Sequence, residues 1–223
     1  GSEGVMCGNG VRCAAEFLYT HGVRRDCIRI DTPSAGQRVL HRVGDGLWQV
    51  EMGRFTAAPD AVGAVGLGGG PLLDVPLCAG GRAWRVHCVA VGNPHCVLFT
   101  HEPPPTGAEL AAWGRALGHH PAFPGGINVE FAQPISPTGL AVTVWERGSG
   151  ATLACGTGAC AVAAAAVLTG RCPRGAPILV QLPGGTLEVC VQRDDTVLLT
   201  GDAAATFSGT VLIQPCKAPR GVV

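Results

Sequence analysis

The most restrictive feature of this sequence is an internal repeat built on two cysteine-glycine turns. The turns read Cys7-Gly8-Asn9-Gly10 and Cys155-Gly156-Thr157-Gly158, and an alanine-containing apolar run follows each. Other positions recur at the same offset of 148 residues, in the pairs Gly8/Gly156, Gly10/Gly158, Ala15/Ala163, Gly22/Gly170, Gly36/Gly184 and Gly53/Gly201. Turn glycines recur where the backbone needs a conformation that other residues avoid. The repeat predicts two copies of one α+β unit, related by a pseudo-two-fold axis.

Hydrophobic periodicity and turn residues predict the elements of both copies. Helices are predicted over 11–20, 108–117 and 161–168. Strands are predicted over 27–31, 39–43, 48–52, 72–75, 84–91, 96–99, 127–131, 140–146, 178–182, 187–191, 197–200 and 211–214. The Pro-, Gly- and Ala-rich segment 54–81 is predicted to be a loop or linker around the short strand 72–75.

The two copies differ in what precedes the cysteine. Residues 84–154 lead into Cys155, whereas only residues 1–6 lead into Cys7. Repeat symmetry therefore predicts that roughly 65 to 75 further residues precede Gly1 in the full protein. We accordingly expect the 223-residue chain to be an N-terminally truncated form with weak or no activity.

Composition excludes several classes of function. The formal net charge is zero, with 16 basic and 16 acidic residues, and no basic patch indicates nucleic acid. The longest apolar run, Ala159–Leu168, is too short to cross a bilayer. The chain has 11 cysteines but no C-x-x-C spacing that suggests zinc, so we expect mostly free thiols, a reducing cytoplasmic setting and no metal. Most of them are expected to be small buried apolar residues, namely Cys27, Cys78, Cys88, Cys96, Cys172, Cys190 and Cys216.

Cys7 and Cys155 are the exceptions, because each stands just ahead of a predicted helix. The free N–H groups and the positive dipole of a helix N-terminus favour a thiolate, so a lowered thiol pKa is expected at both. Two such thiols suit inversion of a carbon centre, in which one face needs a base and the other an acid. The glycine turns offer N–H groups for a substrate carboxylate. Arg12 is expected to brace its own helix.

Longer motifs around both cysteines resemble the two active-site signatures of the diaminopimelate epimerase family. They are Cys7-Gly8-Asn9-Gly10-Val11-Arg12-Cys13 and Glu146-Arg147-Gly148-Ser149-Gly150-Ala151-Thr152-Leu153-Ala154-Cys155-Gly156-Thr157-Gly158. Three further segments resemble the family in the same order, namely Gly1-Ser2-Glu3, Gly92-Asn93-Pro94-His95-Cys96 and Ile127-Asn128. The resemblance covers essentially the whole chain, but the family's N-terminal His-Gly-x-Gly-Asn-Asp segment is absent from these 223 residues.

The resemblance implies a cofactor-independent isomerase that interconverts LL- and meso-diaminopimelate in lysine biosynthesis. It implies that Cys7 and Cys155 are the acid/base thiols and that His95 and Glu146 tune their protonation. Substrate would be bound by Gly8, Asn9, Asn93, Asn128, Glu146, Arg147, Gly156 and Thr157.

The family fold implies two lobes, each a β-barrel-like sheet wrapped on a central helix. Residues 1–76, completed by 206–223, would form the N-terminal lobe, and residues 77–205 the C-terminal lobe. A homodimer with a contact at Phe207 is also implied.

Three alternatives remain open at this stage. A proline-racemase-like or other amino-acid racemase of the same fold would use the same two thiols, although that type usually has His where Asn9 stands. A thiol redox protein would cycle Cys7 and Cys155 as a disulfide, which leaves the Asn, Glu and Arg residues unexplained. In a non-catalytic binding module the thiols would be dispensable.

Overall fold

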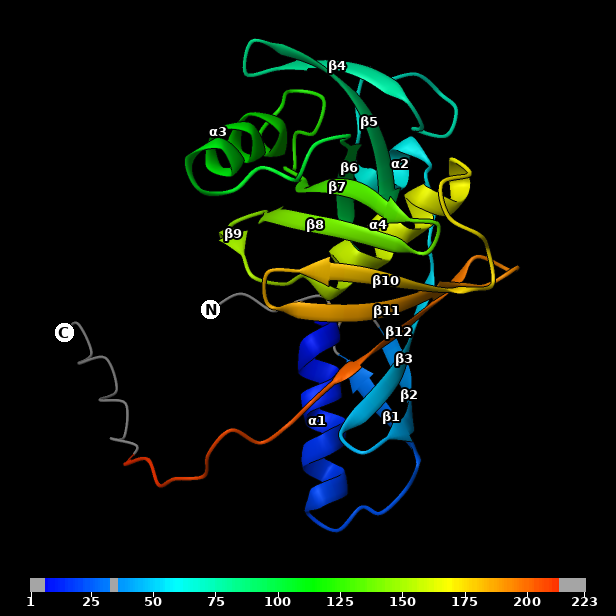
Figure 1. Cartoon of the computed structure of the whole chain (residues 1–223), viewed down its shortest axis with the longest axis vertical. Helices are drawn as coiled ribbons and strands as arrows, with labels where there is room; N and C mark the ends of the chain where they lie inside the picture. Colours follow the sequence, from blue (N-terminus) through cyan, green and yellow to red (C-terminus); the bar gives the residue numbers. More distant parts are fainter. Residues whose placement is uncertain (1–6, 33–35, 213–223) are drawn as a thin grey trace, which may run out of the picture.

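One large sheet organises the computed structural model, which describes residues 7–32 and 36–212. Its main path runs in the order β1-β2-β3-β12-β11-β10-β8-β7-β6-β5-β4, and β9 pairs with β8. Figure 1 shows this sheet extending along the molecule from β1–β3 at one end to β4 at the other. The strands are β1 (Cys27–Thr32), β2 (Gly36–Gly44), β3 (Leu47–Arg54), β4 (Val75–Ala79), β5 (Arg82–Ala90), β6 (Pro94–Phe99), β7 (Asn128–Ser136), β8 (Gly139–Glu146), β9 (Gly150–Thr152), β10 (Pro177–Leu182), β11 (Gly185–Val191) and β12 (Thr196–Asp202).

Four helices accompany the sheet in the described residues: α1 (Gly8–Thr20), α2 (Pro59–Val62), α3 (Gly107–Gly118) and α4 (Gly156–Leu168). Helix α4 contacts strands on several sides, including β5, β6, β7, β10, β11 and β12. Helix α1 contacts β1, β3, β12 and α4. In Figure 1 α1 lies beside β1–β3, while α4 runs behind the middle of the sheet.

The core follows the sheet's two faces. One buried cluster extends from Val11 and Trp48 beside α1 to the whole alanine-rich length of α4. A second cluster, with Trp84 and Phe131 at its centre, lies under α3. Alternate residues of each strand reach opposite faces, so Val129 and Phe131 of β7 join the α3 cluster while Ala132 joins the α4 cluster. This alternation decides which side chains reach the N-terminus of α4.

The predicted elements agree with most of the observed ones, with four corrections. Both cysteine-flanked helices begin at the residue after the cysteine, because the cysteine itself is the N-cap. Segment 54–81 contains the short helix α2, and its strand is β4 rather than 72–75. The three-residue strand β9 was not predicted. Val211 and Leu212 lie outside any strand, and the rest of the predicted strand 211–214, like Gly1–Glu3 and Cys216, lies outside the described residues.

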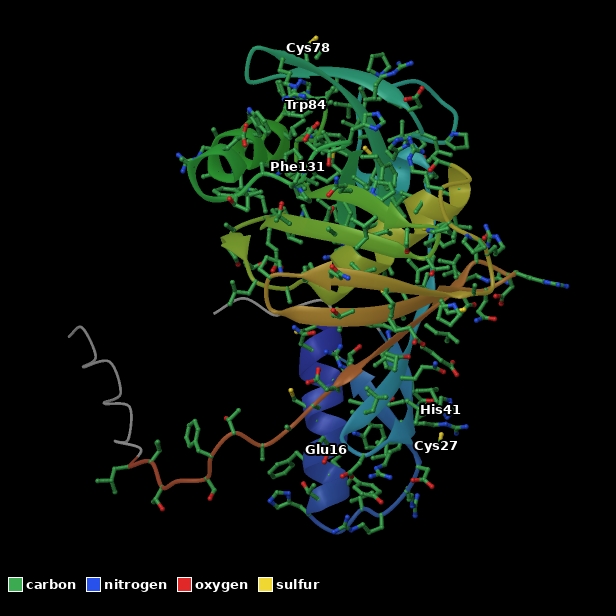
Figure 2. All side chains as sticks on the ribbon, in the orientation of Figure 1. Glu16, Cys27, His41, Cys78, Trp84 and Phe131 are labelled. Carbon is green, nitrogen blue, oxygen red and sulfur yellow. The ribbon has the colours of Figure 1, made fainter. Side chains whose placement is uncertain are left out.

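The ten cysteines of the described part are free thiols. Cys88, Cys96 and Cys172 are buried as predicted, and Cys190 is half-buried. The same prediction was wrong for Cys27 and Cys78, which are exposed. Figure 2 labels these two near opposite ends of the molecule. Each lies on a strand near one end of the sheet order, where alternate side chains face solvent.

Candidate active site

Cys7 and Cys155 occupy the same local position in two different helices. Cys7 is the N-cap of α1 with φ −134° and ψ 106°, and Cys155 is the N-cap of α4 with φ −131° and ψ 114°. Each Sγ accepts a hydrogen bond from the third residue on, Gly10 N at 3.3 Å and Gly158 N at 3.4 Å. A side chain that accepts from N3 of the helix is the usual N-cap geometry. Both sulfurs therefore lie at the positive end of a helix dipole.

The two helix N-termini meet. A Cβ placed on Gly8 would lie 3.5 Å from Cα of Gly156, and a Cβ placed on Gly156 would lie 3.3 Å from Cα of Gly8. Leu199 Cδ2 of β12 lies against both, at 2.9 Å and 3.2 Å from those Cβ positions. A side chain at either glycine would crowd the Leu199 methyl first and the opposite helix next, so glycine suits this close approach. The structure thus brings together the two turns that the repeat paired.

Cys155 is a buried thiol, with 7% of its surface exposed. Burial raises its pKa to about 12, and the carboxyl groups of Glu130 and Glu146 add to that rise. Hydrogen bonds with Thr157 Oγ1, at 3.4 Å, and Gly158 N act in the opposite direction. The expectation of a lowered pKa at this cysteine was therefore wrong, because desolvation of a thiolate outweighs the helix terminus. The burial of Cys155 therefore favours its thiol form.

Cys7 has a different surrounding. Its side chain is exposed, and Gly10 N is its one hydrogen-bond donor among the described residues.

Arg12, in the second turn of α1, is buried and donates to Gly8 O at 3.1 Å and to Asn9 Oδ1 at 3.0 Å. A third bond, 3.4 Å long, joins Arg12 Nε to Asp202 O of β12. The prediction that Arg12 braces its own helix is confirmed.

A buried acid pairs with His95. His95 Nδ1 lies 2.6 Å from Glu130 Oε1, and His95 Nε2 lies 2.9 Å from Asn93 Oδ1. Both His95 and Glu130 have no exposed surface. Burial raises the pKa of Glu130, while the charge and hydrogen bond of His95 oppose that rise. Sequence reasoning included His95 and Asn93 but missed Glu130. The signal available was a carboxylate in the middle of an apolar strand, which is rare without a partner.

Hydrogen bonds of Asn128 and Arg147 connect two loops. Asn128 Nδ2 donates to Pro94 O at 2.9 Å, and Asn128 Oδ1 accepts from Arg147 N at 2.9 Å. The Arg147 side chain is exposed and donates to Gly125 O at 3.0 Å. Asn128 therefore uses both ends of its amide within the protein. This places the loop after Glu146 beside the turn that carries Asn93 and His95.

Glu146 stands at the end of β8, half-buried, and accepts from Thr152 Oγ1 at 2.6 Å. A hollow of about 640 Å³ opens beside it, lined by Arg115, His119, Trp145, Glu146, Gly148, Ser149 and Gly150. Another hollow of about 510 Å³ lies between β5 and α3, against Trp84 and Trp113, and includes none of the predicted site residues. The chemistry gathers at the helix N-termini, so we place the candidate site there.

The described ranges hold neither a metal-ligand cluster nor a membrane-spanning helix. There, no three His, Cys, Asp or Glu side chains are grouped closely enough to hold a metal ion. None of the described helices combines the length and apolar character that a bilayer span requires.

A family model and individual relatives indicate the same protein family. The diaminopimelate epimerase family model matches residues 87–206. A diaminopimelate epimerase of Synechococcus sp. (strain JA-2-3B'a(2-13)) is 47% identical over 224 residues, covering 94% of this chain and 74% of the relative. The diaminopimelate epimerase of Synechococcus elongatus is 43% identical over 213 residues, covering 95% of this chain and 74% of the relative.

Solved structures establish the fold. A probable proline racemase from Agrobacterium radiobacter K84 matches with a TM-score of 0.69 at 17% identity, covering 96% of this chain and 69% of that one. A predicted epimerase from Pseudomonas aeruginosa matches with a TM-score of 0.55 at 22% identity, covering 89% of this chain and 73% of that one. At these identities the likeness is one of fold: a mixed α/β architecture with a large sheet and few helices.

Proposed function

The chain belongs to the diaminopimelate epimerase family, and from that premise we propose that it interconverts LL- and meso-diaminopimelate by a two-thiol mechanism without a cofactor. The observation that carries the proposal is the meeting of the two cysteine-capped helix N-termini at Gly8 and Gly156. One thiol on each helix is the arrangement that removes a proton from one face of a carbon and returns one to the other. The setting we propose is the lysine pathway of the cytoplasm.

The two thiols take different roles in the proposed reaction. Burial disfavours the thiolate of Cys155, which is the proton donor, whereas the exposed Cys7 is the base for the substrate isomer that presents its α-hydrogen to it. In the reverse direction the roles exchange. Backbone N–H groups at Gly8 and Asn9, and at Gly156 and Thr157, would hold the substrate carboxylate, on which negative charge grows as the α-proton leaves.

The remaining residues form the proposed walls of the site. We propose that Asn93, Asn128, Glu146 and Arg147 recognise the amino-acid groups of the substrate, and that His95 and Glu146 tune the two thiols. Support comes from their proximity: Asn128 ties the Pro94 turn to Arg147, and the Glu146 carboxyl acts on the pKa of Cys155. Asn128 would hold these loops and offer the substrate its second Nδ2 hydrogen, since Nδ2 makes one hydrogen bond among the described residues.

The alternatives differ in how they fit these observations. A proline-racemase-like activity shares the fold, but relatives at 43% and 47% identity are named diaminopimelate epimerases. A thiol redox protein would cycle Cys7 and Cys155 as a disulfide, which leaves the Asn128–Arg147 arrangement beside them unexplained. A non-catalytic binding module would give the thiols of Cys7 and Cys155 no function.

We also propose two lobes, with residues 1–76 and 206–223 in one and 77–205 in the other, and a homodimer that buries Phe207. The matching geometry of the two cysteine caps supports the lobes. Phe207 is 87% exposed, and Val211 and Leu212 of the same segment are exposed too, which supports an apolar contact with a second copy. Sedimentation of wild type and Phe207→Ser tests this: a dimer that becomes a monomer is expected, and a monomeric wild type contradicts it.

The function is tested by α-proton exchange from diaminopimelate into deuterated water, measured on the complete gene product. Cys7→Ala and Cys155→Ala are each expected to lose roughly 1,000-fold or more, because each removes one of the two proton carriers. Cys13→Ala on α1 and Cys160→Ala on α4 are the matched controls and should retain most of the activity. Exchange that survives either of the first two substitutions would refute the two-thiol mechanism.

A further inference from the structure

The alternation of side chains along β7 places Glu130 on the face of the sheet that packs against α4. It stands two residues after Asn128 on β7, so both face the same side of the sheet as Ala132, which packs in the α4 cluster. The β6 residues on this face are His95 and Val97, and Val97 pairs directly with Glu130. A carboxyl group with no exposed surface among apolar side chains is costly to retain. Its position therefore calls for a chemical reason.

The hydrogen bonds of His95 fix the number of protons in the pair. The contact is to Asn93 Oδ1, an acceptor, and with this orientation of the amide we assign a hydrogen to His95 Nε2. The 2.6 Å contact between His95 Nδ1 and Glu130 Oε1 then requires one more proton between these two atoms. That proton makes either an imidazolium with a carboxylate or a neutral imidazole with a carboxylic acid. In both forms the pair is neutral as a whole and holds one shared proton.

The carboxyl group also touches the turn of Cys155. A Cβ placed on Gly158 would lie 2.7 Å from Glu130 Oε1 and 3.4 Å from Cys155 Sγ. Glu130 Oε2 is buried and has no hydrogen-bond partner among the described residues. The equivalent glycine of the first helix, Gly10, has only Cys7 atoms that close within the described part of the chain. Glu130 therefore lies beside the turn of one of the two thiols, that of Cys155.

We propose that Glu130 is a positioning residue of the reaction: it holds His95 in one orientation and keeps a shared proton beside Cys155. This rests on the proposed function. The advantage of a neutral pair is electrostatic, because a bare carboxylate next to Cys155 would oppose its thiolate whenever that thiol must give up its proton. The titratable groups around Glu130 are His95 and Cys96 of β6, Glu146 of β8 and Cys155 at the N-cap of α4.

Kinetics of Glu130→Gln in the complete gene product test the proposal, because glutamine keeps the shape but cannot share the proton. We expect kcat to fall roughly 10- to 100-fold in each direction, as for other groups that orient a reactive residue, with KM changed less than about twofold. His95→Gln should lose a similar amount, and the double variant no more than the larger single loss, since both act as one unit. The matched control is His87→Gln, a buried histidine of β5 that bonds Asp74 N and lies outside the site.

Nitrogen NMR of histidine-labelled wild type gives a second readout that needs no active variant. His95, identified by its loss in His95→Gln, should carry a hydrogen on Nε2 at neutral pH, and its Nδ1 shift should move in Glu130→Gln while His87 stays unchanged. An unprotonated Nε2 in wild type, or wild-type kcat in Glu130→Gln, overturns the role of Glu130. Failure of the proposed function looks different, since wild type itself would then exchange no α-proton.

Discussion

The two helices that follow the cysteines are the same locally and opposite in their surroundings. The caps agree within a few degrees in φ and ψ, and both sulfurs accept from the third backbone N–H. Yet α4 is buried over its first eleven residues, whereas α1 buries only Gly8, Val11, Arg12 and Ala15. Cys155 is accordingly buried and Cys7 exposed. Tertiary burial, rather than the local motif, decides the direction of the pKa shift at Cys155.

This difference bears directly on a two-base mechanism. Two identical thiols would begin each turnover in the same protonation state, and the reaction needs one of each. A desolvated Cys155 starts as the acid because burial disfavours its thiolate. The buried Glu130–His95 pair stands on the Cys155 side, so the asymmetry extends to the groups behind the sulfur.

Alkylation of the thiols should show the comparison most strongly. With a pKa raised to about 12, Cys155 in the native chain has a thiolate fraction near 10⁻⁴ at pH 8. This is about 1,000-fold less than a thiol with a pKa near 9, and the greater nucleophilicity of a more basic thiolate recovers only about 20- to 30-fold. Iodoacetamide should therefore modify native Cys155 at least about 30-fold more slowly than the same residue in urea.

Peptide mapping by mass spectrometry measures the alkylation rate at Cys155. The pH dependence of that rate shows the direction of the pKa shift. A raised pKa means that the rate at Cys155 should climb about tenfold per pH unit at least to pH 11, since thiolate forms only as pH approaches about 12. The exposed Cys13 on α1 is the internal control for reagent and time. Equal rates at Cys155 in native and unfolded chains would remove the asymmetry on which the acid role rests.

Local sequence patterns predicted the paired motifs and most strands, because glycine, alternation and helical runs act within a few residues of one another. They did not predict which strands pair in parallel, such as β6 with β7 and β8 with β10. That choice depends on contacts between distant segments. The same limit explains the pKa error at Cys155 and the omission of Glu130, since burial of both comes from strands far along the chain.

Helices α4 and α1 should also differ in their tolerance to leucine at equivalent positions, which is the smaller effect. Phe17 on α1 is 60% exposed, whereas Ala165, its equivalent 148 residues later on α4, is fully buried. Leucine at either position gives a matched pair. Ala165→Leu should lower the free energy of unfolding by about 2 kcal/mol or more through overpacking, and Phe17→Leu should change it by less than about 0.5 kcal/mol. Urea denaturation of the chain followed by circular dichroism measures both, and a costly Phe17→Leu beside a harmless Ala165→Leu would mean that α1, not α4, is the enclosed helix.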